Sequence, residues 1–321
     1  MTKRFVHLHV HSHYSLLQAL PKIPDLVKHA QKYGMDALAV TDNGNLYNAI
    51  EFTKECAGTP IKPIIGVDFF VAPRTRHDKE PRIDNRSKKL LLIAKDQTGY
   101  DNLIKLVTLS NFEGFYYRPR IDKELIEKHK EGLIAIIPSF GSEAYGFART
   151  NNIEEAKKNI EYYKSVYGSS TDPKESNLFI EITRHDDVED HQMTTERMIS
   201  VAQDTGVPLV AAHNVYYIDP DDKKARTTLL SVQKSFSSGP VEDDAGDFSF
   251  KGVDEMIELI RGIKGAELCA DSAIENTGII ADRCTLQIVL GKWVFPKVKV
   301  DDRFSSVDKP YDEQLREIVY L

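Results

Sequence analysis

Three histidines at alternate positions near the start of the chain could bind a metal ion. His7, His9 and His11 lie in the run Phe-Val-His-Leu-His-Val-His-Ser that begins at Phe5. The apolar residues between them predict a short strand, and side chains two apart on a strand point to the same face. Imidazoles presented on one face can hold a divalent transition metal, although a metal site needs three or more ligands. The pattern alone also fits a strand whose histidines only form hydrogen bonds.

The composition is that of a globular protein with room for one large domain or two small ones. The chain has 321 residues and a formal net charge of −7, which argues against strong nucleic-acid binding by this chain alone. No run approaches the roughly 18 apolar residues of a membrane helix, and no signal-peptide segment precedes the first predicted strand. The widely spaced Cys56, Cys269 and Cys284 indicate reduced thiols. We therefore expect a cytoplasmic protein without membrane contact.

Two local patterns allow more than one interpretation. Residues 74–89 hold seven lysines and arginines against three acids. Such a segment is usually a solvated, mobile loop, but it could also face phosphates within a larger assembly. Residues 116–120 interleave aromatic residues with arginines, which can indicate stacking on nucleic-acid bases. We expect the latter segment to pack on a neighbouring domain.

Short apolar runs alternate with helical patterns along most of the chain. We expect seven buried strands, over residues 5–10, 37–41, 63–67, 89–94, 133–137, 178–182 and 208–212. Helices are expected over residues 24–33, 45–57, 100–111, 153–167, 193–205, 221–234, 253–261 and 265–284. Strands that are mostly followed by helices predict a largely parallel sheet covered by helices. A closed barrel is favoured, with its site at the carboxyl ends of the strands, and an open doubly wound sheet is the alternative.

The last part of the sequence differs from the rest. Residues 235–250 predict a loop, and residues 296–310 are charged and turn-rich like a linker. Residues 311–321 begin a helical pattern that has no C-terminal stop signal. We therefore expect the chain to be a fragment of a longer protein.

Several segments resemble one known family. Residues 7–12 (His-Leu-His-Val-His-Ser), 41–46 (Thr-Asp-Asn-Gly-Asn-Leu) and 61–66 (Ile-Lys-Pro-Ile-Ile-Gly) look like the polymerase-and-histidinol-phosphatase (PHP) domain. Segments within 94–122 and 275–296 are similar to the start of bacterial replicative DNA polymerase III alpha subunits. The resemblance implies a distorted seven-stranded (β/α) barrel with a C-terminal helical extension over 1–285. It also implies that 286–321 is a linker and the truncated start of the polymerase palm region.

The resemblance also implies where a metal cluster would lie. In active relatives about nine His, Asp, Glu and Cys side chains bind up to three metals that activate water for phosphoester hydrolysis. His9 and His11 match two of those positions, and Asp68 stands where a glutamate is expected. The other six positions carry an amide, an ammonium, a hydroxyl or a phenol in their place; these residues are Gln18, Asn43, Lys89, Ser139, Asn214 and Tyr216.

Such replacements are weak ligands for Zn²⁺ or Mn²⁺, and a protonated lysine has no lone pair to offer. We therefore expect no catalytic residues, no catalytic metal cluster and no cofactor. A single zinc or manganese ion on His9, His11 and Asp68 remains the alternative. His13, His185 and His213 could supplement such a site, although lone histidines of this kind more often form hydrogen bonds.

Three functions follow as hypotheses. The first is the N-terminal PHP domain of a DNA polymerase III alpha subunit, a nucleotidyltransferase of DNA replication. Its barrel would be an inactive scaffold and a docking platform for the proofreading exonuclease subunit. Its partners would be the rest of the polymerase chain and that exonuclease, with DNA bound only in the holoenzyme. The second is a metal-dependent phosphoesterase or 3′–5′ exonuclease with a reduced metal site. The third, a stand-alone phosphatase of the histidinol type, is disfavoured by the polymerase-like segments after residue 94.

Overall fold

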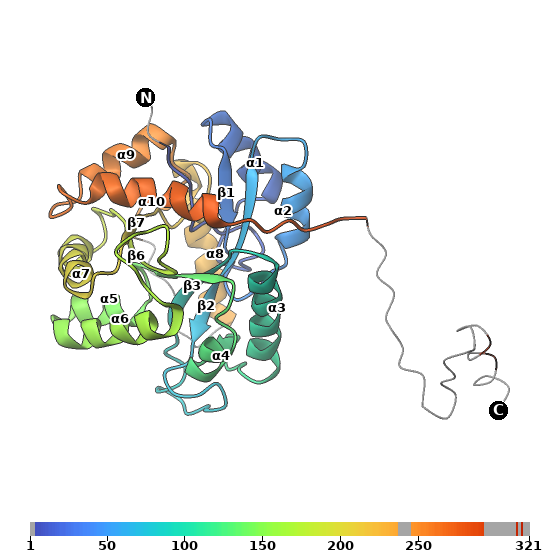
Figure 1. Ribbon diagram of the computed structural model, residues 1–321, viewed down its shortest axis with the longest axis horizontal. Coiled ribbons are helices and arrows are strands. Elements are labelled where there is room, and N and C mark those ends of the chain that lie inside the picture. Colours follow the sequence, from blue (N-terminus) through green and yellow to red (C-terminus); the bar gives the residue numbers. More distant parts are fainter. Residues whose placement is uncertain (1–3, 237–244, 292–312, 314–315, 317–321) are drawn as a thin grey trace. The chain divides into compact units, whose positions relative to one another are not determined.

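The computed structural model describes residues 4–236, 245–291, 313 and 316. Seven strands form one curled sheet in the order β1-β2-β3-β5-β6-β7, with the short β4 paired to β2 (Figure 1). The strands are β1 (Ala37–Val40), β2 (Lys62–Val71), β3 (Lys88–Ala94), β4 (Arg120–Ile121), β5 (Leu133–Ile137), β6 (Leu178–Ile182) and β7 (Leu209–Ala211).

The N-terminal segment lies between the two edges of this sheet. On one side, the His7 carbonyl accepts from Ala39 N–H in β1 at 2.9 Å. On the other side, His11 N–H donates to the Val215 carbonyl beyond β7 at 2.9 Å, and Val10 forms an isolated parallel bridge with Val215. The segment therefore connects the edges, and the predicted distorted barrel is confirmed.

The same segment is not the regular strand that its pattern predicts. Side-chain hydroxyls bond two of its backbone N–H groups: Val6 N–H donates to Thr277 Oγ1 and Val10 N–H to Thr41 Oγ1, both at 3.1 Å. These bonds replace the backbone partners that a regular ladder would supply.

Strand directions differ in one place from the largely parallel arrangement that we expected. β3 runs antiparallel to both β2 and β5, whereas β1–β2, β5–β6 and β6–β7 are parallel. A parallel neighbour needs a crossover, usually through a helix, but residues 72–87 between β2 and β3 contain no helix. The chain therefore returns along β2 in the opposite direction.

Helices lie outside the sheet (Figure 1). They are α1 (Ile23–Lys32), α2 (Ala49–Cys56), α3 (Gln97–Phe112), α4 (Lys123–Lys128), α5 (Glu143–Arg149), α6 (Ile153–Tyr167), α7 (His191–Thr205), the 3₁₀ turn η1 (Pro220–Asp222), α8 (Lys223–Phe236), α9 (Val253–Arg261) and α10 (Ala270–Arg283). α2 starts four residues later than predicted, because the Asn45 side chain accepts from Tyr47 N–H and donates to two carbonyls in a local turn. In the described part of the chain, no helix is long and apolar enough to cross a membrane.

Alternate residues of the central strands enter two separate apolar cores. Leu90 and Leu92 of β3 pack in the cluster beneath the outer helices. Leu91 and Ile93 pack inside the barrel together with Ile280 of α10. Because the barrel interior is filled by apolar side chains over much of its depth, any chemistry must lie at one end.

The C-terminal predictions are only partly covered by the structure. Residues Met1–Gln287 form one compact unit and Ile288–Leu321 another. The linker and helix expected over 296–310 and 311–321 lie outside the described residues, apart from Glu313 and Arg316. The boundary predicted at residue 285 stays a prediction.

Candidate metal site at the barrel mouth

The three predicted ligands come together at the carboxyl end of the barrel. One ligand atom from each of His9, His11 and Asp68 lies within 4.8 Å of the others. Nε2 of His9 is 3.5 Å and Nε2 of His11 is 3.6 Å from Asp68 Oδ2. All three side chains are fully buried. The N-terminal segment supplies the imidazoles, and β2 supplies the carboxylate.

His7 does not share this face. Its Nε2 lies 2.9 Å from the Lys251 carbonyl, and its ring packs against Phe5 and Phe250. The alternation that predicts one face for all three histidines fails because the segment is not a regular strand.

A second buried carboxylate holds the first histidine. Glu181 lies in β6, and its Oε2 is 2.8 Å from His9 Nδ1. Ser139 donates its backbone N–H and its hydroxyl to Glu181 Oε1 at 3.0 and 2.8 Å. Our sequence reasoning missed Glu181, although a single acid within Leu-Phe-Ile-Glu-Ile is a signal of a buried, partnered carboxylate.

The electrostatics of this pair follow from burial and mutual attraction. Burial alone would lower the pKa of His9, but the Glu181 and Asp68 carboxylates outweigh it and raise the pKa to about 9. Burial likewise favours the neutral form of Glu181, yet the nearby His9 ring holds the Glu181 pKa below its ordinary value. His11 behaves differently, because burial dominates and lowers its pKa.

Lys89 places an ammonium group beside the remaining carboxylate. Its Nζ is 2.8 Å from Asp68 Oδ2 and donates to Asn43 Oδ1 at 2.9 Å and to the Tyr216 hydroxyl at 3.4 Å. The Asn43 amide in turn donates to Gln18 Oε1. Although burial opposes ionisation, Lys89 keeps the pKa of Asp68 well below its ordinary range.

Tyr216 closes the other side of the mouth. Its ring stacks on His11 with centroids 4.2 Å apart and an interplanar angle of 4°. The fully buried Arg226 guanidinium lies 4.0 Å from the same ring centroid, and its Nε donates to the Gln18 carbonyl at 3.3 Å. Nothing in our sequence reasoning singled out Arg226, which comes from a helix beyond the seventh strand.

The side chains present do not suit a cluster of metal ions. Four of the six replaced positions, Gln18, Asn43, Lys89 and Tyr216, are joined through the Lys89 ammonium. Ser139 binds Glu181, while Asn214 is buried and its Oδ1 has no partner among the described residues. Within the part of the chain that the structure describes, Nε2 of His9 and Nε2 of His11 are the only buried ring nitrogens without hydrogen bonds that also face Asp68. This donor set suits at most a single ion, and such binding stays a prediction.

The other histidines that could have supplemented the site form a separate cluster or lie apart. His185 and His213 stack on each other with centroids 4.9 Å apart, and Phe140 and Phe248 pack against His185. His13 packs against Tyr14 instead. Among the described residues, only His9, His11 and Asp68 form a group with metal-ligand spacing.

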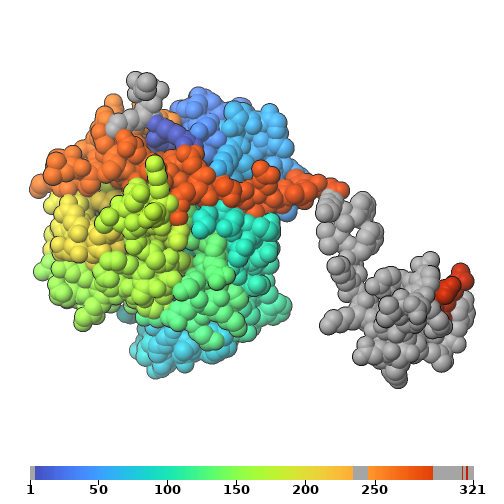
Figure 2. All heavy atoms as spheres, in the orientation of Figure 1, coloured from blue at the N-terminus to red at the C-terminus, as the bar shows by residue number. Residues whose placement is uncertain are grey.

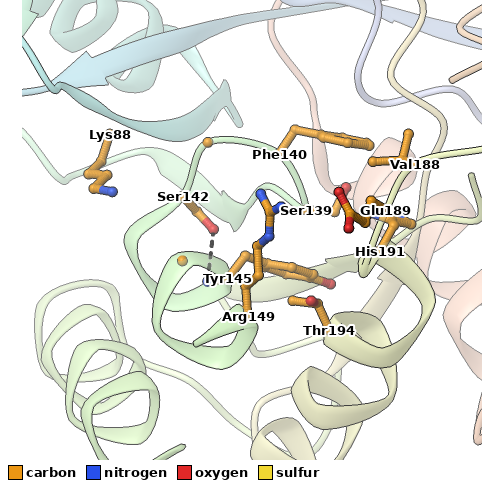
Figure 3. A pocket seen from close by; sticks show the side chains of 12 residues that line it. Lys88, Ser139, Phe140, Ser142, Tyr145, Arg149, Val188, Glu189, His191 and Thr194 are labelled. Atoms are coloured by element: carbon orange, nitrogen blue, oxygen red, sulfur yellow. Dashed lines mark hydrogen bonds between the residues drawn. The ribbon is translucent and has the colours of Figure 1, made fainter. Parts of the chain in front are cut away.

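A cavity of about 260 Å³ adjoins the mouth on the β5 side. Ser139 lines it together with Lys88, Arg149, Glu189 and His191, and Figure 3 shows Arg149 and Glu189 pointing into it. Arg149 Nε lies 3.5 Å from Asp190 Oδ2, so an acid beside the cavity pairs with one of its two cations.

Comparison with known proteins places this arrangement in a family. The chain is 35% identical to the DNA polymerase III subunit alpha of Borreliella burgdorferi over 95% of its own length and 26% of that protein. It is 33% identical to the same subunit of Aquifex aeolicus over 100% of its own length and 27% of that protein. The chain thus spans about a quarter of these curated relatives.

One solved structure, an amidohydrolase from Chromobacterium violaceum, is 11% identical with a TM-score of 0.45. The alignment covers 66% of this chain and 87% of that protein. The model of the PHP domain matches residues 7–185, more than half of the sequence, which include His9, His11 and Asp68. The chain therefore belongs to the PHP domain family.

Proposed function

We propose that this chain is the N-terminal domain of a replicative DNA polymerase alpha subunit, and that its barrel is a catalytically silent brace. The observation that carries the proposal is the Lys89 ammonium, 2.8 Å from the fully buried carboxylate of Asp68. An ammonium supplies the positive charge that a buried carboxylate needs, but it cannot polarise a phosphate oxygen as a Lewis acid does.

Burial of the mouth supports the same proposal. His9, His11 and Asp68 have no exposed surface, whereas a phosphoester must reach the ions that hydrolyse it. A dication added beside Lys89 would face a fixed positive charge at close range in a poorly solvated site.

The network is well suited to bracing. Through Lys89 and Glu181 it ties together the N-terminal segment, β2, β3, β6 and the loops after β1, β5 and β7. Ion pairs and hydrogen bonds between these segments fix their relative positions. The partners of such a brace would be the rest of the polymerase chain and the proofreading exonuclease, with DNA held in the complete assembly.

Metal content and hydrolysis measured on the same sample test this function. The chain is purified without a polyhistidine tag, analysed for zinc and manganese, and assayed with an aryl phosphate and a labelled oligonucleotide. We expect less than one ion per chain and no metal-dependent hydrolysis. Two or more bound ions together with hydrolysis would contradict the silent brace, as would incorporation of dNTPs on a primed template by this chain alone.

A second candidate, a metal-dependent phosphoesterase or 3′–5′ exonuclease with a reduced site, is favoured by one observation. Nε2 of His9 and Nε2 of His11 lack hydrogen bonds and both face Asp68, as two ligands of one zinc or manganese ion would. This candidate requires hydrolysis that depends on added metal and disappears in His9→Ala. Anomalous scattering from crystals soaked in zinc shows whether an ion sits between these residues.

A further inference from the structure

A buried arginine of β4, which pairs with the carboxyl end of β2, joins two surface segments. Arg120 is fully buried, and its guanidinium donates to the carbonyls of Asp84, Arg76 and Asp78 at 2.8, 3.0 and 2.9 Å. The same guanidinium donates to the Gly114 carbonyl at 2.9 Å. Carbonyls of the loop 74–86 and of the turn 112–118 therefore meet at one side chain, which holds the two segments side by side.

Most acids in and next to these segments form ion pairs with Arg74 and Arg76. Arg74 pairs with Asp84 at 2.5 Å and with Glu80 at 3.1 Å. Arg76 pairs with the carboxylates of Glu113, Asp122 and Glu124 at 2.6 to 3.0 Å. Six acids lie in or next to these segments. Five of them form the ion pairs with Arg74 and Arg76 given above, and the sixth, Asp78, accepts a hydrogen bond from the Thr75 hydroxyl.

Three cations of the loop remain exposed without such partners. Lys79, Arg82 and Arg86 are exposed, and none of them makes an ion pair with another described residue. Figure 2 shows the loop, in cyan, protruding at the lower edge of the body beside the teal and green residues of α3 and α4. The positive charge is therefore directed to solvent, although the chain as a whole is acidic.

Three large aromatic side chains of the turn 112–118, which Arg120 links to this loop, are exposed. Phe112 is 85% exposed, Phe115 is 53% exposed and Tyr117 is 49% exposed. Exposure of this degree at neighbouring aromatic residues is unusual on a surface that has no partner.

The backbone is strained at one residue of each segment. Tyr117 has φ 59° and Arg82 has φ 70°, in the left-handed region that favours glycine. Strain of this kind persists where the surrounding structure enforces it, and it concentrates at binding sites. Arg120 binds the carbonyls of Asp84 and Gly114, which lie two and three residues from these two positions.

We propose that Lys79, Arg82, Arg86, Phe112, Phe115 and Tyr117, the aromatic–basic face, bind single-stranded nucleic acid. The aromatic rings stack on unpaired bases, and the three cations contact the phosphates between them. Charge favours this ligand, because three exposed cations without ion-pair partners among the described residues match the regularly spaced phosphates of a single strand. The proposal goes beyond the bracing role and does not depend on it.

Fluorescence anisotropy with labelled oligo-dT tests the face on the full chain. In about 50 mM salt we expect saturable binding that weakens as salt rises, with a log–log slope reduced by about 0.7 for each cation removed. Arg82→Gln with Arg86→Gln should lower that slope, and both side chains are exposed, so folding is preserved. Tyr117→Gly should weaken binding about fivefold or more while leaving the slope unchanged.

Lys158→Gln, at an exposed lysine of α6, is the matched control and should bind like the unchanged chain. A blunt duplex of the same length should bind more weakly than oligo-dT, because paired bases cannot stack on the rings. No binding by the unchanged chain, equal effects in the control and the face variants, or equally tight binding of the duplex would each overturn the proposal.

Discussion

The barrel mouth and the aromatic–basic face use the same kinds of side chain in opposite ways. At the mouth, Lys89 is buried against Asp68 and the Tyr216 ring lies between His11 and Arg226. On the face, Arg82 is exposed without an ion-pair partner among the described residues, and Tyr117 is half exposed. Cations and rings that are paired within the fold stabilise it, whereas those left unpaired at the surface remain available to a ligand.

Removing the buried ammonium of Lys89 should have the largest effect and tests whether a paired cation stabilises the fold. Lys89→Met removes the nearest cation from the buried Asp68 and leaves only the His9 ring, 3.5 Å away, so we expect the loss of this buried ion pair to cost about 3–5 kcal/mol of unfolding free energy. Urea unfolding followed by circular dichroism measures the loss. The neighbouring Lys88 is half-buried and forms no ion pair with a described residue, so Lys88→Met is the matched control and should change stability by less than about 0.5 kcal/mol. Equal losses in the two variants would show that Lys89 contributes only packing.

A buried cation also supports the exposed face. Arg120→Met leaves four carbonyls without their donor, and each unsatisfied buried group costs roughly 1–3 kcal/mol. Because the loop can relax toward water, we expect a total loss of about 3 kcal/mol, smaller than for Lys89→Met. Limited proteolysis should cut the loop 74–86 sooner in this variant than in the unchanged chain. An unchanged cleavage pattern would mean that the ion pairs of Arg74 and Arg76 hold the loop by themselves.

Acid should weaken the region beside the mouth through its neutral histidines. Burial lowers the pKa of His213 to about 3, with His7, Asp247 and Lys251 as its charged or titratable neighbours, and burial also lowers the pKa of His185. Below the ordinary value of about 6.5 the unfolded chain takes up protons that the folded chain does not, so stability falls as pH falls. Between pH 6.5 and 5 each such histidine costs about 2 kcal/mol. Urea midpoints that stay constant from pH 7 to pH 5 would contradict this, and His213→Asn should reduce the slope.

Sequence patterns predicted where helices and strands lie more readily than how the strands pair in space. The bounds of α6 and α9 match the predicted 153–167 and 253–261, because apolar spacing, acids in the first turn and a glycine after the last residue mark each segment. The direction of β3 could not be predicted, since an apolar run looks the same in a parallel or an antiparallel pair.

At the mouth, the ligand residues could be identified from the sequence, but the contacts between them could not. Family resemblance indicated His9, His11 and Asp68, and a lone acid in an apolar strand could have indicated Glu181. The contact of Lys89 with Asp68, by contrast, depends on the register of β2 with β3, where Phe70 pairs with Lys89. No local pattern encodes that register, so an ammonium beside the carboxylate could not be predicted from spacing.

The smallest expected effect is that of Tyr117→Gly, which tests whether the backbone strain at Tyr117 serves binding or folding. Tyr117→Gly places at φ 59° the residue that adopts this conformation without steric cost, and the exposed ring gives up little buried surface. We expect the unfolding free energy to rise by about 0.5–1 kcal/mol while oligo-dT binding weakens. No comparable gain is available at the mouth, where each substitution considered removes a buried partner. A destabilised Tyr117→Gly variant would mean that the ring's contact with Tyr116, at 4.7 Å between centroids, contributes more than the strain costs, and Tyr117 would then belong with the paired side chains of the mouth.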